Sequence, residues 1–492
     1  MLSYDMVFVP DPPATAAMFG RTGGFPRQVP SDAFAAALSF LPHSQQLILL
    51  SVFVLAAWGV GRLVPGGLPA KLAAVVVYLW NPYLAERLLL GHWALLLGYA
   101  GLPWVLDAVL RRRRASVLAA SLLPAAVGGF AAMNVTALVL AGGLAAVRGR
   151  GALRVLLVFP AMALPWLVPA LLNASDTRTD PGGVDLFAAR ADTPFGTLGS
   201  LLSLGGIWNA ETVPPGYTAP LPAFLRLLLC LAALAALALH RSPAARAALY
   251  SGTAGLALAC LGATAPGRAL LRSLVEFWPG FGALRDGQLY LAPLALAVAL
   301  GLSLLAARPA PREDPSPSRP REELRRRRDG WGLTWVAAVP VLLLPTLAWG
   351  ISARLQAVDY PAEWRAAQRL INADPVGGDL LSLPWGAYRR PEWNGGRAVL
   401  DPWPRLAARR VVWDDGLRVG GRSLAQEDPW AADTDALLRA GGELAPKLAA
   451  SGFRYVVISR DHSEQAWTSR LHGAERVIEG PTLIVYRLGH SG

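Results

Sequence analysis

The chain has 492 residues, of which 53% are hydrophobic and only 16% are charged. Since a soluble globular protein is about one-quarter charged, this composition excludes an ordinary water-soluble chain and predicts that much of the length contacts a lipid bilayer. The formal net charge of +12 could favour nucleic acid, but the densest basic runs lie directly beside apolar segments. Because such runs set membrane orientation, we interpret them as topology signals and expect no nucleic-acid partner.

Apolar segments are long enough to predict an α-helical polytopic membrane protein with about ten transmembrane segments, since a spanning helix needs about 20 mostly apolar residues. The clear candidates are Gln45–Val64, Trp93–Leu110, Val155–Asn173, Leu221–Leu239, Ala248–Ala263, Tyr290–Ala307 and Trp331–Ile351. Shorter or broken candidates are Ala70–Pro82, Ser116–Gly129 and Ala131–Val147. We therefore expect a transmembrane domain over residues 45–307 and a last transmembrane helix over residues 331–351.

Four basic clusters predict the orientation of these segments. They are Arg111–Arg114, Arg148–Arg154, Arg241–Arg246 and Arg308–Arg328, and the positive-inside rule places each in the cytoplasm. The segments then alternate without conflict. The regions expected outside are Met1–Ser44, Asn81–His92, Ser175–Pro220, Pro266–Leu289 and everything after Ser352.

Two regions outside the spans need a separate interpretation. Residues 1–44 are expected to form an extracytoplasmic loop, yet they have neither the basic start nor the apolar core of a signal peptide. We interpret this as a sign that a first transmembrane helix is missing from the sequence. Residues 308–330 are rich in Pro, Arg, Glu and Ser, a composition typical of a disordered cytoplasmic linker.

Residues 352–492 predict a folded extracytoplasmic α/β domain. Helical periodicity marks Pro361–Ala373 and Leu437–Ser451, and strand-like runs are Asp379–Leu383, Tyr455–Ser459, Arg476–Ile478 and Thr482–Tyr486. Both cysteines, Cys230 and Cys260, fall in apolar stretches, so the domain must fold without disulfides. No nucleotide-binding, zinc or nucleophile-elbow motif is visible in it.

Polar residues near the predicted outer membrane face occur in three places. They are the carboxylates Asp5 and Asp11, the group Glu86, Arg87 and His92, and the group Arg285, Asp286 and Gln288. Because unpaired charge costs roughly 2–3 kcal/mol or more toward the bilayer centre, charges near it are retained when they are paired or functional. Each also has a structural interpretation, as a solvated loop acid, an interfacial ion pair, an aromatic-flanked anchor or a helix cap.

Three strings carry a resemblance to a known group of proteins: Asn81-Pro82-Tyr83-Leu84-Ala85-Glu86-Arg87, Gly91-His92-Trp93 and Leu284-Arg285-Asp286-Gly287-Gln288. With the number of spans, an acidic first outer loop and a C-terminal outer domain, they resemble the GT-C superfamily of membrane glycosyltransferases, particularly actinobacterial arabinofuranosyl- and mannosyltransferases. The resemblance implies a polyprenyl-phosphate sugar donor, a cell-envelope glycan or glycolipid acceptor, and a multi-pass protein of the cytoplasmic membrane.

The resemblance also implies roles for these residues. Asp5 is the first candidate for the base that accepts the proton of the acceptor hydroxyl, and Asp11 is the second. Arg285, Arg87 and His92 are candidates to meet the lipid phosphate, since Arg binds phosphate with two prongs. Glu86, Asp286 and Gln288 complete the expected substrate-binding set. Family members often carry a close acidic pair in the first loop, whereas these two acids stand six positions apart, so a divalent metal stays an open possibility and no cofactor is certain.

Two other classes of function remain open at this stage. A transporter or flippase of envelope polysaccharide would place charged residues mid-span or show inverted repeats. A structural membrane protein would need none of the loop acids. The gathering of polar groups near one membrane face favours the glycosyltransferase.

Overall fold

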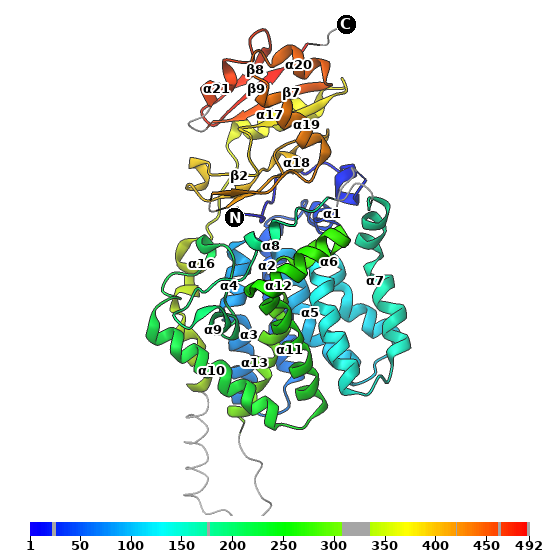
Figure 1. Ribbon diagram of the computed structural model, residues 1–492, viewed down its shortest axis with the longest axis vertical. Coiled ribbons are helices and arrows are strands. Elements are labelled where there is room, and N and C mark those ends of the chain that lie inside the picture. Colours follow the sequence, from blue (N-terminus) through cyan, green and yellow to red (C-terminus); the bar gives the residue numbers. More distant parts are fainter. Residues whose placement is uncertain (22–25, 175–177, 308–334, 420, 461–463, 490–492) are drawn as a thin grey trace, which may run out of the picture.

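The computed structural model describes residues 1–21, 26–174, 178–307, 335–419, 421–460 and 464–489. An elongated molecule results, with a helical domain at one end and a smaller α/β domain at the other (Figure 1). The helical domain consists of α2 (Ser44–Leu63), α3 (Leu68–Leu79), α4 (Pro82–Leu89), α5 (Trp93–Leu110), α6 (Ala115–Ala146), α7 (Ala152–Leu172), α10 (Pro220–Leu239), α11 (Pro243–Ala263) and α13 (Ala292–Leu305). The shorter helices are α1 (Ser31–Ala37), α8 (Gly183–Leu186), α9 (Gly196–Leu202) and α12 (Ala265–Phe277).

Seven helices in the described ranges are long and apolar enough to cross a membrane: α2, α5, α6, α7, α10, α11 and the segment Gly287–Leu305, which ends in α13. The chain is thus a multi-pass membrane protein, as predicted, but the count of about ten spans is not confirmed. One predicted span, α3, has only 12 residues, and two others are joined in α6.

Helix α6 is a hairpin of two arms rather than one long rod. The backbone leaves helical geometry at Gly129, where φ is 76°. A Cβ at Gly128 would lie 2.2 Å from the carbonyl oxygen of Ala94 at the start of α5, and one at Gly143 would lie 2.9 Å from Val109 near its end. The chain therefore runs back along α5 before Gly129 and forward along it afterwards, and the predicted segments Ser116–Gly129 and Ala131–Val147 correspond to these arms.

The predicted continuous helix over 331–351 is wrong for the part that the structure describes. Residues 335–353 form four short pieces, η5 (Trp335–Ala337), α15 (Val339–Leu343), η6 (Pro345–Leu347) and α16 (Ala348–Ala353). Pro345 has no N–H to continue the helix that precedes it. The carbonyl of Leu343 instead accepts from Arg226 and that of Leu344 from the indole of Trp80, each at 2.9 Å. The predicted linker 308–330 lies outside the described residues.

The C-terminal domain is built on a five-stranded sheet of order β4-β1-β7-β9-β8. Its strands are β1 (Asp379–Leu383), β4 (Val411–Val412), β7 (Phe453–Ser459), β8 (Glu475–Glu479) and β9 (Leu483–Arg487), and β1 lies parallel to both β4 and β7. The helices are α17 (Ala362–Ala373), α18 (Trp403–Leu406), α19 (Pro429–Arg439), α20 (Ala445–Ala450) and α21 (Glu464–Thr468). Short strand pairs are β2 (Tyr388–Arg389) with β3 (Val399–Leu400) and β5 (Arg418–Val419) with β6 (Arg422–Ser423).

The four predicted strands correspond to β1, β7, β8 and β9 and the first predicted helix to α17, whereas β4 and the short strand pairs were not predicted. One predicted helix does not match. The predicted helix Leu437–Ser451 is divided between α19 and α20. Gly441 and Gly442 separate them with φ values of 70° and 73°, a left-handed conformation that glycine adopts without strain.

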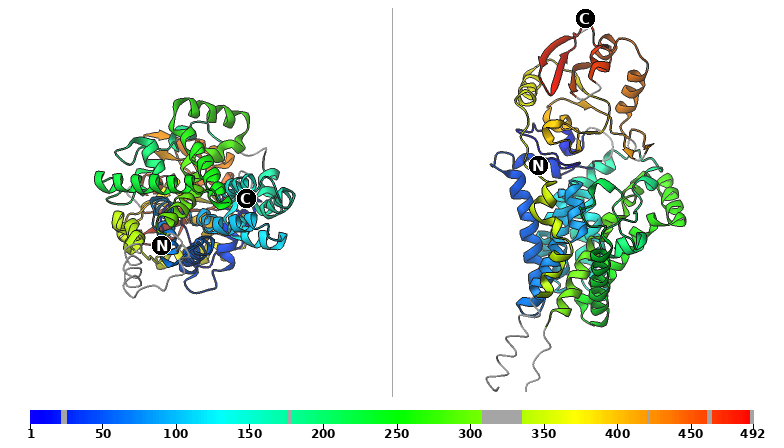
Figure 2. Two further views of the ribbon diagram at one scale, coloured as in Figure 1. Left: turned by 90° about the horizontal axis from the view of Figure 1, so that it is seen from below. Right: turned by 90° about the vertical axis from the view of Figure 1, so that its left-hand side faces the viewer.

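The N-terminal loop, residues 2–11, lies between the two domains (Figure 2). The N–H of Asp5 donates to the carbonyl of Leu90 after α4, while Tyr4 pairs with the β3 region through Ala398 and Leu400. Met6 belongs to the core of the helical domain, whereas Leu2 and Val7 belong to the core beneath the sheet. The loop is therefore packed into both domains at once.

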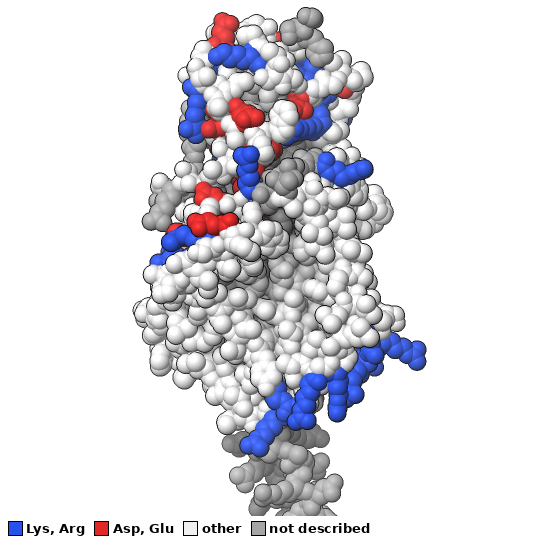
Figure 3. Space-filling model, turned by 45° about the vertical axis from the view of Figure 1, so that its right-hand side comes forward, with Lys and Arg blue, Asp and Glu red and all other residues white. Residues whose placement is uncertain are grey.

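Charge is distributed along the long axis as a membrane protein requires. On the face that Figure 3 shows, an uncharged band crosses the helical domain, with basic side chains gathered at the lower end of the domain and charges of both signs on the C-terminal domain. The helices of this domain carry exposed apolar side chains, among them Leu156 on α7, Leu228 on α10 and Leu50 on α2. Such a surface is stable only in contact with lipid or protein.

Candidate functional site

Asp5 lies at the junction of the two domains, with a partner from each. Its Oδ1 accepts a hydrogen bond of 2.7 Å from the hydroxyl of Tyr388 in β2, and Oδ2 lies 3.3 Å from Nε2 of His92, just before α5. The side chain keeps 40% of its surface exposed. Burial of the Asp5 carboxyl group raises its pKa, because it disfavours the charged form. The interactions with His92 and Tyr388 outweigh this effect and hold the pKa of Asp5 below its usual value.

Gly91 allows this approach of the N-terminal loop to the helical domain. Its φ of 79° is left-handed, and a Cβ there would lie 2.0 Å from the backbone nitrogen of Met6 and 2.4 Å from the carbonyl oxygen of Ser3. Real side chains cannot approach so closely, so only glycine fits between α4 and the loop. In the string Gly91-His92-Trp93, Gly91 thus leaves room for the N-terminal loop and His92 contacts Asp5.

His92 is oriented by Arg87, which is fully buried in α4. Nη1 of Arg87 lies 3.0 Å from Nδ1 of His92, and because arginine can only donate, Nδ1 must accept. The imidazole proton is therefore on Nε2, facing Asp5. Arg87 also donates two hydrogen bonds to the carboxylate of Asp286, at 2.5 and 2.9 Å, and one to the side-chain oxygen of Gln288. Arg87 and Asp286 consequently position His92 rather than stand free for a ligand.

Glu86 extends this cluster deeper into the helical domain. The amide of Gln288 donates to its Oε2 at 2.9 Å, and its carboxyl group also interacts with Asp192, a residue that the sequence analysis did not single out. Burial, followed by the charge of Asp192, raises the pKa of Glu86 well above its usual value. Glu86 and Gln288 are both fully buried. In this conformation they cannot contact a ligand directly, and they act by holding Arg87 in place.

Arg285 lies on the other side of Asp286 and faces the C-terminal domain. Its Nη1 donates to Oε1 of Glu427 at 3.3 Å, and its guanidinium lies 5.3 Å from the ring of Phe187. Burial, and then the charge of Arg27, lowers the pKa of Arg285 to about 10, which leaves it protonated at neutral pH. Arg27 pairs with the other oxygen of the same carboxylate. Glu427 thus bridges two arginines.

Asp415 holds the turn that presents Glu427. Its Oδ2 accepts the backbone N–H of Glu427 at 3.2 Å and that of Asp428 at 2.9 Å. Burial raises the pKa of Asp415 to about 6. Neither Arg27, Asp415 nor Glu427 was predicted as a site residue, because their neighbours in sequence give no indication that they meet Arg285.

Asp11 lies apart from this cluster. Its side chain is exposed, and it is the Asp11 carbonyl that contacts Gln368 of α17, at 3.1 Å. Within the described residues no group of three or more His, Cys, Asp or Glu side chains is gathered as a metal site would require. Since Asp5 and Asp11 do not converge, these residues do not fit a shared divalent metal, and no step below is assigned to one.

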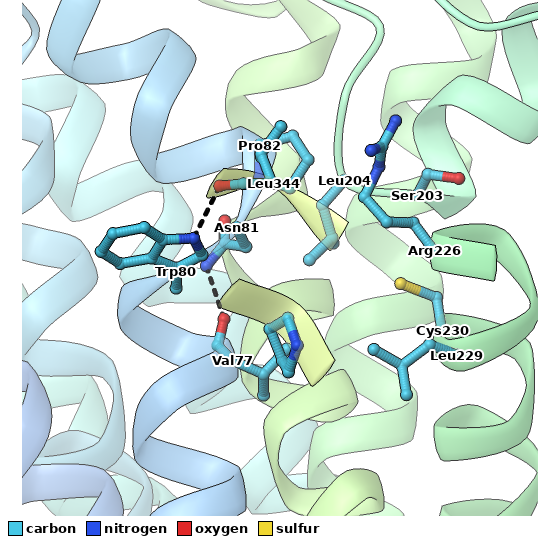
Figure 4. A pocket seen from close by; sticks show the side chains of 11 residues that line it. Val77, Trp80, Asn81, Pro82, Ser203, Leu204, Arg226, Leu229, Cys230 and Leu344 are labelled. Atoms are coloured by element: carbon cyan, nitrogen blue, oxygen red, sulfur yellow. Dashed lines mark hydrogen bonds between the residues drawn. The ribbon is translucent and has the colours of Figure 1, made fainter. Parts of the chain in front are cut away.

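A narrow hollow enters the helical domain beside the broken segment 335–353. Figure 4 shows Trp80 and Asn81 on one side and Arg226, Cys230 and Ser203 on the other, with Leu344 between them. Arg226 is 5% exposed; it donates to the carbonyl of Tyr217 and lies 4.3 Å from that ring. The hollow is mainly apolar and lies beside a buried cation.

Together these features define a polytopic membrane protein whose polar cluster lies where the helical domain meets an α/β domain. No protein-family model and no curated protein matches the sequence. Solved structures of the arabinofuranosyltransferase AftD from Mycobacteria, determined by single-particle cryo-EM, do resemble the chain. One has 20% identity and a TM-score of 0.53, covering 91% of this chain and 34% of that one.

Two further structures, classes of a mutant of the same protein, have 18% and 17% identity and TM-scores of 0.52, covering 92% of this chain and 36% of theirs. The likeness extends over both domains, so the predicted resemblance to an arabinofuranosyltransferase is confirmed at the level of the fold. The chain spans about one-third of the length of these neighbours.

Proposed function

We propose that this protein is a GT-C-type glycosyltransferase that moves a sugar from a polyprenyl-phosphate donor to a cell-envelope glycan or glycolipid on the extracytoplasmic side of the membrane. The observation that carries the proposal is the Asp5 carboxylate. It is ionised, 40% exposed and held between His92 and Tyr388 at the outer end of the helical domain. The fold likeness to an arabinofuranosyltransferase supports the same class of reaction.

Asp5 is the proposed base. The acceptor hydroxyl attacks the anomeric carbon of the donor sugar, its proton passes to Asp5, and the bond between that carbon and the phosphate oxygen breaks. The lipid phosphate leaves with the bonding electron pair. His92 and Tyr388 each contact one oxygen of the carboxylate, which holds its orientation while 40% of the side chain stays exposed.

Arg285 is the proposed partner of the leaving phosphate. It stays protonated at neutral pH and is already paired with the carboxylate Glu427, an anion of similar charge and hydrogen-bonding geometry. A donor phosphate would displace Glu427 from this arginine. Positive charge at this position stabilises the negative charge that develops on the leaving group.

Asp11 has no role in the proposed chemistry, because its exposed side chain does not join the cluster. The domain beyond residue 352, which supplies Tyr388 and Glu427, is proposed to lie outside the cytoplasm. This orientation follows from the basic loops at the opposite end of the uncharged band. The transferred sugar is proposed to be a pentose or hexose, and an arabinofuranosyl donor is the first to test, because the fold neighbour is an arabinofuranosyltransferase.

The test is a transfer assay with the purified chain in nanodiscs and a panel of polyprenyl-phosphate sugars. Asp5→Asn keeps the shape and removes the proton acceptor, so we expect a loss of about 100- to 10,000-fold in transfer rate with donor binding little changed. Asp11→Asn is the matched control and should retain the parental rate within a few-fold. If Asp5→Asn transferred as fast as the parent, the base would be assigned wrongly. Donor binding without transfer by the parent would favour a transporter.

A further inference from the structure

A polar cavity lies beside the N-terminal loop, with Ser3 and Tyr4 in its lining. Its volume is about 340 Å³, within the range of about 300–1,000 Å³ typical of small-molecule sites. Five segments distant in sequence form its wall: the N-terminal loop, the end of α4, the turn at Glu211, the segment after α16 and the loop before β3. Such a cavity between two domains is a common position for a ligand site.

The lining of the cavity is unusually basic for its size. It includes Arg354, Arg390 and Arg397, opposed by one carboxylate, Glu211. Arg390 is neutralised by Glu211 at 2.6 Å, and that carboxylate also accepts from the hydroxyl of Tyr4. Within the described residues, Arg354 and Arg397 form no ion pair with a carboxylate, so the cavity has an excess of positive charge.

Arg397 is the least satisfied of these cations. Its only side-chain donation within the described residues is from Nη2 to Asn394, at 3.2 Å, and its Nε is buried without any hydrogen-bond partner. A buried donor left unpaired costs free energy, so an acceptor oxygen that reached this guanidinium would be bound favourably. Arg354, by contrast, is braced by the carbonyl oxygens of Val213 and Glu211.

Glycines keep the space beside Arg397 open. Gly395 and Gly396 are both left-handed, with φ of 64° and 68°, and nothing lies within 4 Å of a Cβ built at Gly396. Tyr4 also lines the cavity. Its ring contacts that of Tyr388 edge-on at 5.5 Å, and Tyr388 in turn donates to Asp5. A ligand that moved Tyr4 would therefore also affect Tyr388, which orients Asp5.

We infer that this cavity is a binding site for a phosphate group carried by a sugar or a lipid. Arginine suits this ligand because its planar fork donates two parallel hydrogen bonds to phosphate oxygens. The cavity is larger than a bare phosphate needs, and Tyr4 offers a ring for an attached sugar. The inference concerns binding alone and does not require that the protein transfer sugar.

The test measures affinity of the full chain in nanodiscs for three probes: inorganic phosphate, glucose 1-phosphate and a short-chain polyprenyl phosphate, with glucose as the uncharged control. We expect at least one phosphate-bearing probe to bind and glucose not to bind. Arg397→Gln should weaken binding about 10- to 100-fold, the usual effect of losing a charge-assisted hydrogen bond. Arg439→Gln is the matched control, because Arg439 on α19 is 73% exposed and does not line the cavity.

Glu211→Gln gives the opposite sign and guards against misfolding as an explanation. Removing the one carboxylate among the described lining residues should strengthen phosphate binding several-fold and raise its sensitivity to salt, whereas Arg397→Gln should lower that sensitivity. Binding of glucose 1-phosphate would identify a soluble phosphosugar as the ligand class, and binding of polyprenyl phosphate alone would identify a lipid headgroup. Binding of a phosphate probe that Arg397→Gln weakens belongs to this cavity, whereas binding that only Arg285→Ala weakens belongs to the proposed transfer site. The inference is overturned if no phosphate probe binds better than glucose, or if Arg397→Gln and Glu211→Gln both bind like the parent.

Discussion

Arg285 of the helical domain and Glu427 of the C-terminal domain form an ion pair at 3.3 Å, with side chains only 11% and 18% exposed. Glu427 therefore occupies the arginine that we propose for the donor phosphate. The carboxylate keeps a buried cation paired while the site is empty and must move aside when a phosphate enters.

Reciprocal substitutions at this pair test the role of Arg285. Arg285→Ala should weaken donor binding and turnover together, by about 10- to 100-fold in kcat/KM, because it removes a charge partner from both the ground and the transition state. Glu427→Gln should instead lower KM for the donor, since the competing charge is gone. Steady-state kinetics with varied donor concentration would measure both. A rise in KM for Glu427→Gln would mean that Glu427 contacts substrate directly.

Gly91 offers a test of the close contact that positions Asp5. Gly91→Ala must adopt a left-handed conformation and also push the N-terminal loop away, so we expect a loss of stability of about 2–4 kcal/mol and a large loss of transfer. Gly149→Ala is the matched control: its φ of 72° imposes the same strain, but nothing lies within 4 Å of the added Cβ. It should lose only about 1 kcal/mol. Thermal melts monitored beside activity would make the comparison, and equal losses at the two positions would argue against the steric role of Gly91.

His92 should control the acid limb of the pH–rate profile. In the parent, the hydrogen bond from His92 lowers the pKa of Asp5, so the base stays ionised as pH falls toward the usual value for Asp. His92→Leu removes that hydrogen bond, and the folded-state pKa of Asp5 must rise. The rate should then begin to fall at a higher pH than in the parent. His43→Leu, at an exposed histidine before α2, is the control. An unshifted acid limb in His92→Leu would show that Asp5 is not the group that titrates.

The proposed orientation can be tested by labelling introduced cysteines in intact cells. Ser423→Cys, on an exposed strand residue of the C-terminal domain, should react with a membrane-impermeant reagent. Arg150→Cys, in the exposed turn between α6 and α7, should react only after the membrane is permeabilised. The native thiols give a low background, because Cys230 is buried and Cys260 is partly buried. The reverse pattern would invert the whole topology.

The sequence predicted the fold where one local pattern dominates. Uninterrupted apolar runs marked α2 and α10, and alternating or apolar runs marked β1 and β7. Prediction from the sequence was less reliable where a proline or glycine interrupts an apolar run. Pro345 ends a helix that hydropathy alone would continue, and Gly129 joins two short spans into one hairpin.

The candidate site was predicted only in part. Asp5 and His92 were singled out from different outer loops, and the structure brings them together. Tyr388 and Glu427 could not be predicted, because they reach the site across 383 and 142 residues respectively and nothing in their local sequence indicates the pairing. The burial of Arg87 and Glu86 was also unforeseen, since a short polar turn gives no sign that the helices around it will enclose it.

The packing of the N-terminal loop also has a consequence for the order in which the protein is made. Asp5 precedes its hydroxyl partner Tyr388, which is synthesised 383 residues later. Leu2 and Val7 likewise become buried only when the sheet that they pack against has formed. A nascent chain halted after the helical domain would thus lack the hydroxyl that binds Asp5, and Leu2 and Val7 would remain uncovered. The final packing of the N-terminal loop is thereby coupled to synthesis of the C-terminal domain.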